Sequence, residues 1–279
     1  MTTEAHAAGP ERRLGAQRLA QYVARGRCER YLRFTLFPSE AAALAERYRV
    51  LQEPLSPLLS AAGQGFERDL VARLRETEIV VDMKSRTEGD FVAVVAAQTA
   101  ERVVYDQPHL AGALGPWECD GRADLVSVER VGDGAVAATI VDVKASRRDT
   151  VGYRLQVAFY ARLLRGALAQ ASVALERLDG AIASLDCASA LATPTFDLGI
   201  YEDEIDRLVA APGSDVERAV GRPPGGATYH LGPVCDGCPH NAVCFVDTAE
   251  REDLSIVPHL TATEKTALRS EGIASARGL

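Results

Sequence analysis

Two aspartates and a lysine on neighbouring predicted strands have residue types suited to hydrolytic chemistry. Residues 135–144 (AVAATIVDVK) are typical of a strand, and residues two apart on a strand project from one face, so Asp142 and Lys144 project together. Residues 117–129 (WECDGRADLVSVE) are expected to form the partner strand, which carries Asp124. A hairpin would bring the two carboxylates together as ligands suited to Mg²⁺ or Mn²⁺. The pattern predicts metal-assisted hydrolysis of phosphodiester bonds, with Lys144 holding and polarising the attacking water.

The surroundings of this motif decide between a functional and a structural interpretation. A charged pair on a strand commonly belongs to a solvated face or blocks edge pairing. Here the run 139–144 is apolar apart from its charges and is expected to be buried, so the two charges require a reason. If residues 117–129 form one continuous strand, Asp124 shares a face with Asp120 and Arg122.

A predicted helix follows the Asp-x-Lys motif directly. It covers residues 153–170, and it places Gln156 and Tyr160, four residues apart, on one face that could pack over the site. Under the alternative, purely structural interpretation, Tyr160 is an ordinary core residue and Gln156 lies beside it without a role in the chemistry. Arg147 and Arg148 lie in the preceding loop, where they are well placed to meet a DNA phosphate.

An acidic residue lies near the start of an upstream helix. The sequence Gly-Gln-Gly-Phe-Glu ends at Glu67 and opens a helix predicted over about residues 65–75. Glu67 could reach the metal from this helix. Alternatively, it is a first-turn acid favoured by the helix dipole.

Together these motifs resemble the RecB-like branch of the PD-(D/E)XK nucleases, in the order Gly-Arg-Ala-Asp124, Val-Asp142-Val-Lys144 and Gln156-x-x-x-Tyr160. The resemblance implies an α/β fold with a restriction-endonuclease-like core, in which helices flank a mixed central sheet. It implies Asp124 and Asp142 as metal ligands, Lys144 as the catalytic lysine, and Gln156 and Tyr160 close to DNA. Many relatives carry a metal-binding histidine in their first motif. This chain has none there, and Glu67 is the nearest equivalent.

A cysteine cluster predicts a second metal site. Cys235-x2-Cys238-x5-Cys244 follows a Pro/Gly-rich linker, and such spacing is typical of metal ligands. We expect Cys28 to be the fourth ligand, because Cys119 and Cys187 fall in predicted strand regions, where buried free cysteines are common. The spacing alone allows zinc, with His230 or His240 as further ligands, or an iron–sulfur cluster.

One cysteine before the core and three after it make the chain similar to the iron–sulfur nucleases, which include AddB-type nuclease domains and CRISPR-associated RecB-like nucleases. This resemblance implies a 4Fe-4S cluster rather than zinc, held by Cys28, Cys235, Cys238 and Cys244. A cross-link from Cys28 to Cys235 closes a loop of about 207 residues, which by analogy with a disulfide stabilises the fold by about 5 kcal/mol. We therefore expect a structural role for the cluster.

The sequence divides into five expected segments. They are a loose tail (1–10), an N-terminal helical segment with Cys28 (11–62), the nuclease core (63–222), the iron–sulfur segment (223–258) and a helical tail that could begin a helix-hairpin-helix-like region (259–279). In the N-terminal segment, helical spacing over 11–33 is broken at Gly26, and a second helix over 40–51 takes Ser39 as its N-cap.

Composition limits the possible partners. The chain has 279 residues and a net charge of −8, which argues against indiscriminate coating of nucleic acid but permits a local basic groove. It has no apolar stretch suited to a membrane span or a secretory signal, so we expect no membrane partner and a cytoplasmic location. No P-loop motif occurs, so any helicase partner would act in trans.

The sequence therefore predicts a metal-dependent DNA nuclease that acts on single strands or DNA ends, as an exonuclease in repair or recombination. One alternative is a RecB-like nuclease of CRISPR adaptation. The other is a non-catalytic DNA-binding module that is cross-linked by its metal site and works with a helicase. The intact set of Asp124, Asp142 and Lys144 argues against the last alternative.

Overall fold

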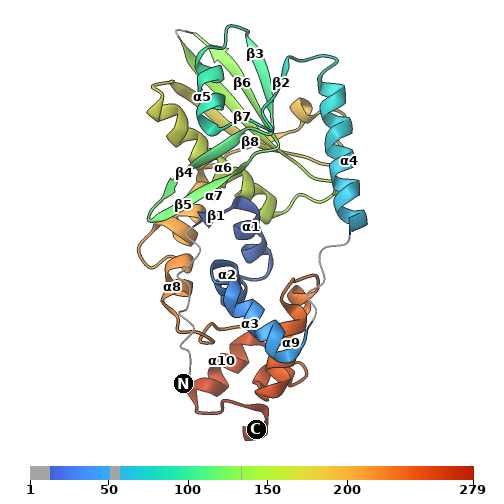
Figure 1. Cartoon of the computed structure of the whole chain (residues 1–279), viewed down its shortest axis with the longest axis vertical. Helices are drawn as coiled ribbons and strands as arrows, with labels where there is room; N and C mark the ends of the chain where they lie inside the picture. Colours follow the sequence, from blue (N-terminus) through green and yellow to red (C-terminus); the bar gives the residue numbers. More distant parts are fainter. Residues whose placement is uncertain (1–12, 51–56, 133) are drawn as a thin grey trace. The chain divides into compact units, whose positions relative to one another are not determined.

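The computed structural model describes residues 13–50, 57–132 and 134–279, which fall into two compact units. One unit is a sheet unit formed by residues 13–21 and 57–214, and the other is a helical unit formed by residues 22–50 and 215–279. Figure 1 traces both units by sequence colour. The expected tail over residues 1–10 lies outside the described residues.

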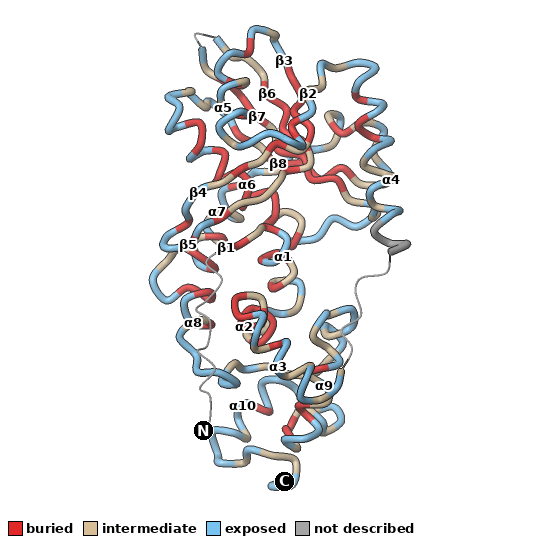
Figure 2. Tube along the Cα trace, in the orientation of Figure 1, coloured by how far each residue is buried: buried red, intermediate tan, exposed pale blue. Residues whose placement is uncertain are grey.

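A six-stranded mixed sheet is the centre of the sheet unit. Its order is β2 (Val80–Asp82), β3 (Arg102–Asp106), β6 (Leu125–Val131), β7 (Ala135–Val143), β8 (Leu175–Ala183) and β9 (Thr195–Phe196). The β2–β3 and β7–β8 pairs are parallel and the other pairs are antiparallel. Figure 2 shows buried positions concentrated along these strands.

Helices cover both faces of this sheet. On α4 (Pro57–Leu74), Leu70 and Leu74 pack into a core cluster with Ala181 and Ala183 of β8. The other face of β8 meets α6 (Val151–Gln170), where a Cβ added at Gly180 would stand 2.9 Å from Val157 Cγ1. The sequence-based prediction of an α/β fold with a mixed sheet and flanking helices is confirmed.

The segment 117–129 is not one strand, contrary to expectation. It divides into β5 (Trp117–Arg122), which joins β1 (Arg13–Leu14) and β4 (His109–Leu114) in a three-stranded sheet, and β6 of the large sheet. The division follows from pairing, because β5 pairs with β4 whereas β6 pairs with β3 and β7. Asp124 lies between the two strands, so it shares no strand face with Asp120 or Arg122.

Several elements were not predicted from the sequence. Among them are β2, β3, β4 and α5 (Glu88–Ala96), which begins with a capping box between Thr87 and Asp90. Beyond α6, α7 (Gly199–Ile205) continues into a π-helical turn over residues 206–210.

The helical unit contains five short helices besides the end of α1 (Ala16–Ala24). They are α2 (Glu29–Leu36), α3 (Pro38–Tyr48), α8 (Asp215–Gly221), α9 (Asn241–Glu250) and α10 (Ala262–Ser270). A positive φ of 64° at Gly26 follows α1 at the expected break. The expected N-cap at Ser39 is wrong, because α3 begins at Pro38, whose fixed φ suits the first helical position. No helix in the described residues is long and apolar enough to cross a membrane.

Candidate functional site

Three neighbouring strands bring polar residues to one edge of the large sheet. In the β6–β7 register Leu125 pairs with Val141, so the next step places Asp124 opposite Asp142. In the β3–β6 register Asp106 pairs with Leu125, and the next residue, Gln107, donates its backbone N–H to the Asp124 carbonyl at 2.9 Å. Strand pairing therefore sets the two aspartates side by side.

Asp142 and Lys144 form a close ion pair at this edge. Lys144 Nζ lies 2.7 Å from Asp142 Oδ1, and the Asp142 side chain is only 1% exposed. Burial, followed by the nearby charge of Asp124, raises the pKa of Asp142 well above its usual value. Burial acts to lower the pKa of Lys144, but Asp142 and Asp124 outweigh it and raise the pKa overall. The lysine is therefore held in its charged form next to a carboxyl whose own charge is disfavoured.

One oxygen of this pair is left without a partner. The buried Asp142 Oδ2 accepts no hydrogen bond from any residue that the structure describes. Leaving such an acceptor unsatisfied costs about 1–3 kcal/mol, more for a charged group. A divalent cation with hard oxygen ligands would satisfy this oxygen and offset the crowding of negative charge, so the donor set suits Mg²⁺ or Mn²⁺.

Two further carboxylates complete the acidic group. Asp124 lies directly before β6, and Glu67 lies on α4. Asp124 Oδ2 accepts the Val143 N–H at 2.7 Å, which fixes the carboxylate against β7. Glu67 Oε1 accepts a hydrogen bond from the Gln107 amide. Burial and then the charge of Asp124 raise the pKa of Glu67, so the two carboxylates lie within electrostatic reach.

Gln156 and Tyr160 are buried on α6, close to the same group. A Cβ added at Gly121 would stand 2.9 Å from Tyr160 Cε1, so the phenol packs directly on β5. Burial, followed by the charges of Asp124 and Asp142, raises the pKa of Tyr160, while its hydrogen bond with Gln156 opposes that shift. The structure thus places Tyr160 beside the acidic residues and Gln156 beside Tyr160.

Arg147 and Arg148 lie on the exposed loop between β7 and α6. The Arg147 guanidinium is 3.2 Å from Asp186, and both side chains of this ion pair are well exposed. The Arg148 backbone N–H donates to Ser146 Oγ at 3.1 Å. An exposed pair of this kind contributes little to stability, so the loop can exchange it for other contacts.

The sequence analysis missed Asp106, Gln107 and Lys84 at this edge. Asp106 is fully buried at the end of β3, with Lys84 Nζ 3.4 Å and an Arg75 Nη2 atom 3.5 Å from its Oδ2. The signal for Lys84 was present in the sequence. Asp82-Met83-Lys84 is the only other Asp-x-Lys in the chain.

The helical unit brings the four expected cysteines near one another. Cys28 is the N-cap of α2, Cys235 ends a short 3-10 helix, and Cys244 lies on α9. Burial raises the pKa of Cys28, and the neighbouring Cys235 and Cys238 thiols add to this rise. Burial raises the pKa of Cys244 to about 12, with Arg30 opposing and the other three thiols adding to the shift.

The remaining two cysteines belong to the sheet unit. Cys119 is buried on β5, where its thiol donates to the Trp117 carbonyl at 3.7 Å. Cys187 packs against the core cluster below α4. Both therefore belong to the sheet unit, whereas the other four cysteines belong to the helical unit.

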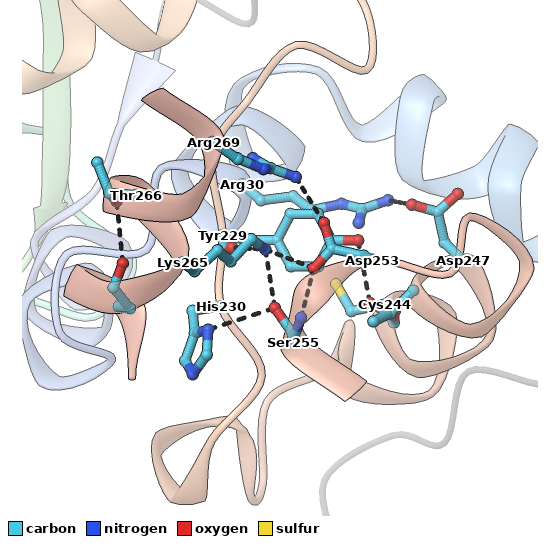
Figure 3. A network of polar contacts seen from close by, with 12 residues as sticks. Arg30, Tyr229, His230, Cys244, Asp247, Asp253, Ser255, Lys265, Thr266 and Arg269 are labelled. Atoms are coloured by element: carbon cyan, nitrogen blue, oxygen red, sulfur yellow. Dashed lines mark hydrogen bonds and ion pairs between the residues drawn. The ribbon is translucent and has the colours of Figure 1, made fainter. Parts of the chain in front are cut away.

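Buried nitrogen atoms without partners lie close to the cysteines. Arg25 Nε, Arg30 Nη1 and His240 Nδ1 are buried and make no hydrogen bond within the described part of the chain. Arg30 lowers the pKa of Cys244 and Arg25 lowers that of Cys238, in each case against the larger effect of burial. Figure 3 shows Arg30 reaching Asp247, with Cys244 nearby. These donors suit an anionic group carried on the four sulfurs.

Neither acidic nor cysteine residues form a closed ligand set. Among residues 13–50, 57–132 and 134–279, no three His, Cys, Asp or Glu side chains are grouped so that they could hold a metal ion. Burial and then the nearby arginines lower the pKa of His240 to about 4, so its imidazole is neutral. Another expected zinc ligand, His230, instead lies 3.3 Å from Ser255 Oγ through its Nδ1.

Comparison with known proteins identifies the family. The sequence profile of the PD-(D/E)XK nuclease superfamily matches residues 16–245. The chain belongs to this superfamily, whose members are generally metal-dependent nucleases.

Among solved structures, the crystal structure of SSO0001 is similar, with 14% sequence identity and a TM-score of 0.34 over 72% of this chain and 77% of that one. Comparison with curated proteins gives no significant match.

Proposed function

We propose that this protein is a RecB-like, Mg²⁺- or Mn²⁺-dependent deoxyribonuclease that hydrolyses phosphodiester bonds in single strands or at DNA ends. The observation that carries the proposal is the buried Asp142–Lys144 pair, set opposite Asp124 with one carboxylate oxygen unsatisfied. A buried pair of this kind is a poor source of stability, because desolvation offsets its attraction. A catalytic role gives a reason for its presence.

Each residue has a role that its surroundings support. Glu67, Asp124 and Asp142 would hold the metal, which when bound supplies Lewis-acid stabilisation of the phosphoryl charge and an acidified water. Lys144 is charged and fixed by Asp142, so it can donate a hydrogen bond to the attacking water or to a phosphate oxygen. Tyr160 and Gln156 shape the wall against which the strand would lie.

The substrate follows from the charge distribution. A net charge of −8 gives no general attraction to duplex DNA. The exposed Arg147 and Arg148 supply local positive charge next to Lys144, which suits a single strand or a frayed end. Action in DNA repair or recombination, with a helicase in trans, is part of the same proposal.

Cleavage of end-labelled oligonucleotides tests the proposal. We expect the wild type to cut DNA with Mg²⁺ or Mn²⁺ and not with a chelator, and we expect Lys144→Met and Asp142→Asn to lose at least about two orders of magnitude in rate. Asp179→Asn is the matched control, because this β8 carboxylate is ion-paired with Arg177 away from the site. Labelled single-stranded DNA, duplex DNA and RNA distinguish the substrates.

Two outcomes would overturn the nuclease proposal. Cleavage that survives both substitutions would remove the proposed chemistry. DNA binding without any cleavage under either metal would leave a non-catalytic DNA-binding module.

We further propose that Cys28, Cys235, Cys238 and Cys244 hold a structural 4Fe-4S cluster. Neighbouring thiols contribute to the raised pKa values of Cys28, Cys238 and Cys244, which supports a common site, and the unsatisfied donors of Arg25 and Arg30 suit its negative charge. Four thiolates are the usual ligands of such a cluster.

Metal analysis of anaerobically purified protein tests the cluster. We expect iron and sulfide together with a visible absorption band, both lost in Cys235→Ser, along with a lower melting temperature. Cys187→Ser is the matched control, because Cys187 belongs to the sheet unit. Zinc without iron in the wild type would refute the cluster, and so would an unchanged spectrum in Cys235→Ser.

A further inference from the structure

A second Asp-x-Lys sequence ends at the same edge of the sheet as the first. Asp82-Met83-Lys84 begins at the last residue of β2, and Asp142-Val143-Lys144 begins at the last but one residue of β7. The chain has only three lysines, and the third, Lys265, is buried in the helical unit. Lys84 keeps 47% of its side chain exposed.

The backbone that carries Lys84 is fixed from three directions. The Lys84 N–H donates to Asp82 Oδ1 at 2.9 Å, and the Met83 N–H donates to the Asp106 carbonyl at 2.8 Å. The Arg122 guanidinium donates to the Met83 carbonyl at 3.1 Å. The backbone at Lys84 is therefore anchored, while the end of its side chain reaches solvent.

Asp106 draws two cations toward this edge. Its carboxylate is fully buried, and neither oxygen has a hydrogen bond from the described residues. Lys84 and Arg75 stand 3.4 and 3.5 Å away, with about half of each side chain exposed. These separations exceed those of close charge-assisted hydrogen bonds, so both cations retain donors for another anion.

The position of Lys84 relative to Lys144 determines which anion it meets. Between their strands lie β3 and β6, so three strand spacings of roughly 4.8 Å separate the backbones of the two lysines by about 14 Å. Phosphates of an extended single strand are spaced more widely than the rise of about 3.4 Å per nucleotide in a duplex, so this span covers fewer than about four nucleotides. The Lys84 ammonium, held against Asp106 on β3, is therefore placed to meet a different phosphate from the one held near Lys144.

We propose that Lys84 is a substrate-positioning residue that binds a backbone phosphate of the DNA strand a few nucleotides from the bond that is cut. The proposal rests on the proposed nuclease function. Asp106 orients the ammonium, and Gln107, the next residue, links this position to Glu67 and Asp124. The strand would run across the ends of β7, β6, β3 and β2.

The role of Lys84 is tested by measuring how tightly the protein binds a labelled single-stranded oligonucleotide over a series of salt concentrations. A chelator is present throughout, so that no cleavage takes place. In Lys84→Met we expect weaker binding, with a slope of log K against log salt that is smaller by about 0.7, the value for one lost phosphate contact on a single strand. Lys84→Arg should keep the wild-type slope. Arg102→Met is the matched control, because Arg102 is a half-exposed, ion-paired cation at the opposite end of β3.

Cleavage kinetics give the second readout. Lys84→Met should raise KM while kcat stays close to the wild-type value, and the rise in KM should vanish on oligonucleotides too short to reach from Lys144 to Lys84. An unchanged salt slope in Lys84→Met would overturn the inference, and so would a loss confined to kcat. The binding arm still decides the role of Lys84 if the protein binds DNA but cuts none, in which case only the nuclease proposal fails.

Discussion

The substitution Asp247→Asn should destabilise the helical unit strongly. The Asp247 carboxylate of α9 is fully buried and joins this helix to two others: Arg30 of α2 donates to it at 2.6 Å and Tyr48 of α3 at 2.7 Å. Arg251, the C-cap of α9, donates to it at 3.0 Å. The Arg30 guanidinium carbon also lies over the Tyr229 ring, 4.2 Å from its centroid. Figure 3 shows the two side chains together. An asparagine amide has one acceptor oxygen, so it cannot serve all three donors.

The expected loss follows from the burial of the pair. Breaking a buried ion pair by removing one partner costs about 3–5 kcal/mol, because the other charge is left uncompensated. For a domain of roughly 60–100 residues each kcal/mol shifts Tm by about 4–8 °C, so the helical unit should melt at least about 12 °C lower. Because α2 carries Cys28 and α9 carries Cys244, the variant should also retain less metal.

The pH dependence of this loss has a definite sign. Burial acts to raise the pKa of Asp247, but Tyr48 and Arg30 outweigh it and lower the pKa overall. A depressed pKa contributes stability that is complete above the unfolded value of about 3.9 and is lost as the pH falls through the folded value. The difference between wild type and Asp247→Asn should therefore be largest at neutral pH and shrink in acid.

Thermal and guanidinium unfolding of the full chain, at neutral and acid pH, measures both effects. Glu250→Gln, an exposed change on α9, is the control. Combining Arg30→Met with Asp247→Leu should recover much of the stability, because the pair is then replaced by apolar groups. The reasoning fails if Asp247→Asn melts within the range of surface variants, about 0.5 kcal/mol, or if its deficit grows in acid.

Two further substitutions test the sheet unit. Asp142→Asn should abolish cleavage and remove one pH dependence of the metal-free protein, because the raised pKa of Asp142 makes wild-type stability fall above about pH 3.9, by at most about 1.4 kcal/mol per pH unit until the folded pKa is passed. Melting in chelator checks this, and parallel pH curves for the two proteins would contradict it. Gly121→Ala should cost about 1–3 kcal/mol, because its Cβ would stand 2.9 Å from Tyr160 Cε1. Denaturant unfolding measures that loss, and Tyr160→Leu in the same chain should reduce it.

The sequence predicted those parts of the site that lie within single elements. Strand alternation put Asp142 and Lys144 together, and they form an ion pair at 2.7 Å. Helical spacing put Gln156 and Tyr160 on one face, and both are buried on α6. Each of these patterns repeats over a few residues, so neighbours along the chain are enough to determine it.

The relations between elements depended on the tertiary structure. Residues 117–129 read as one strand, because nothing local marks the point at which β5 leaves one sheet and β6 enters another. Lys84 went unassigned because it follows β2, which has only three residues and shows no usable alternation. Gln107, Asp124 and the Asp142–Lys144 pair meet because β3, β6 and β7 pair in one register. That register depends on burying the apolar faces of the whole sheet under α4 and α6, which no short stretch of sequence encodes.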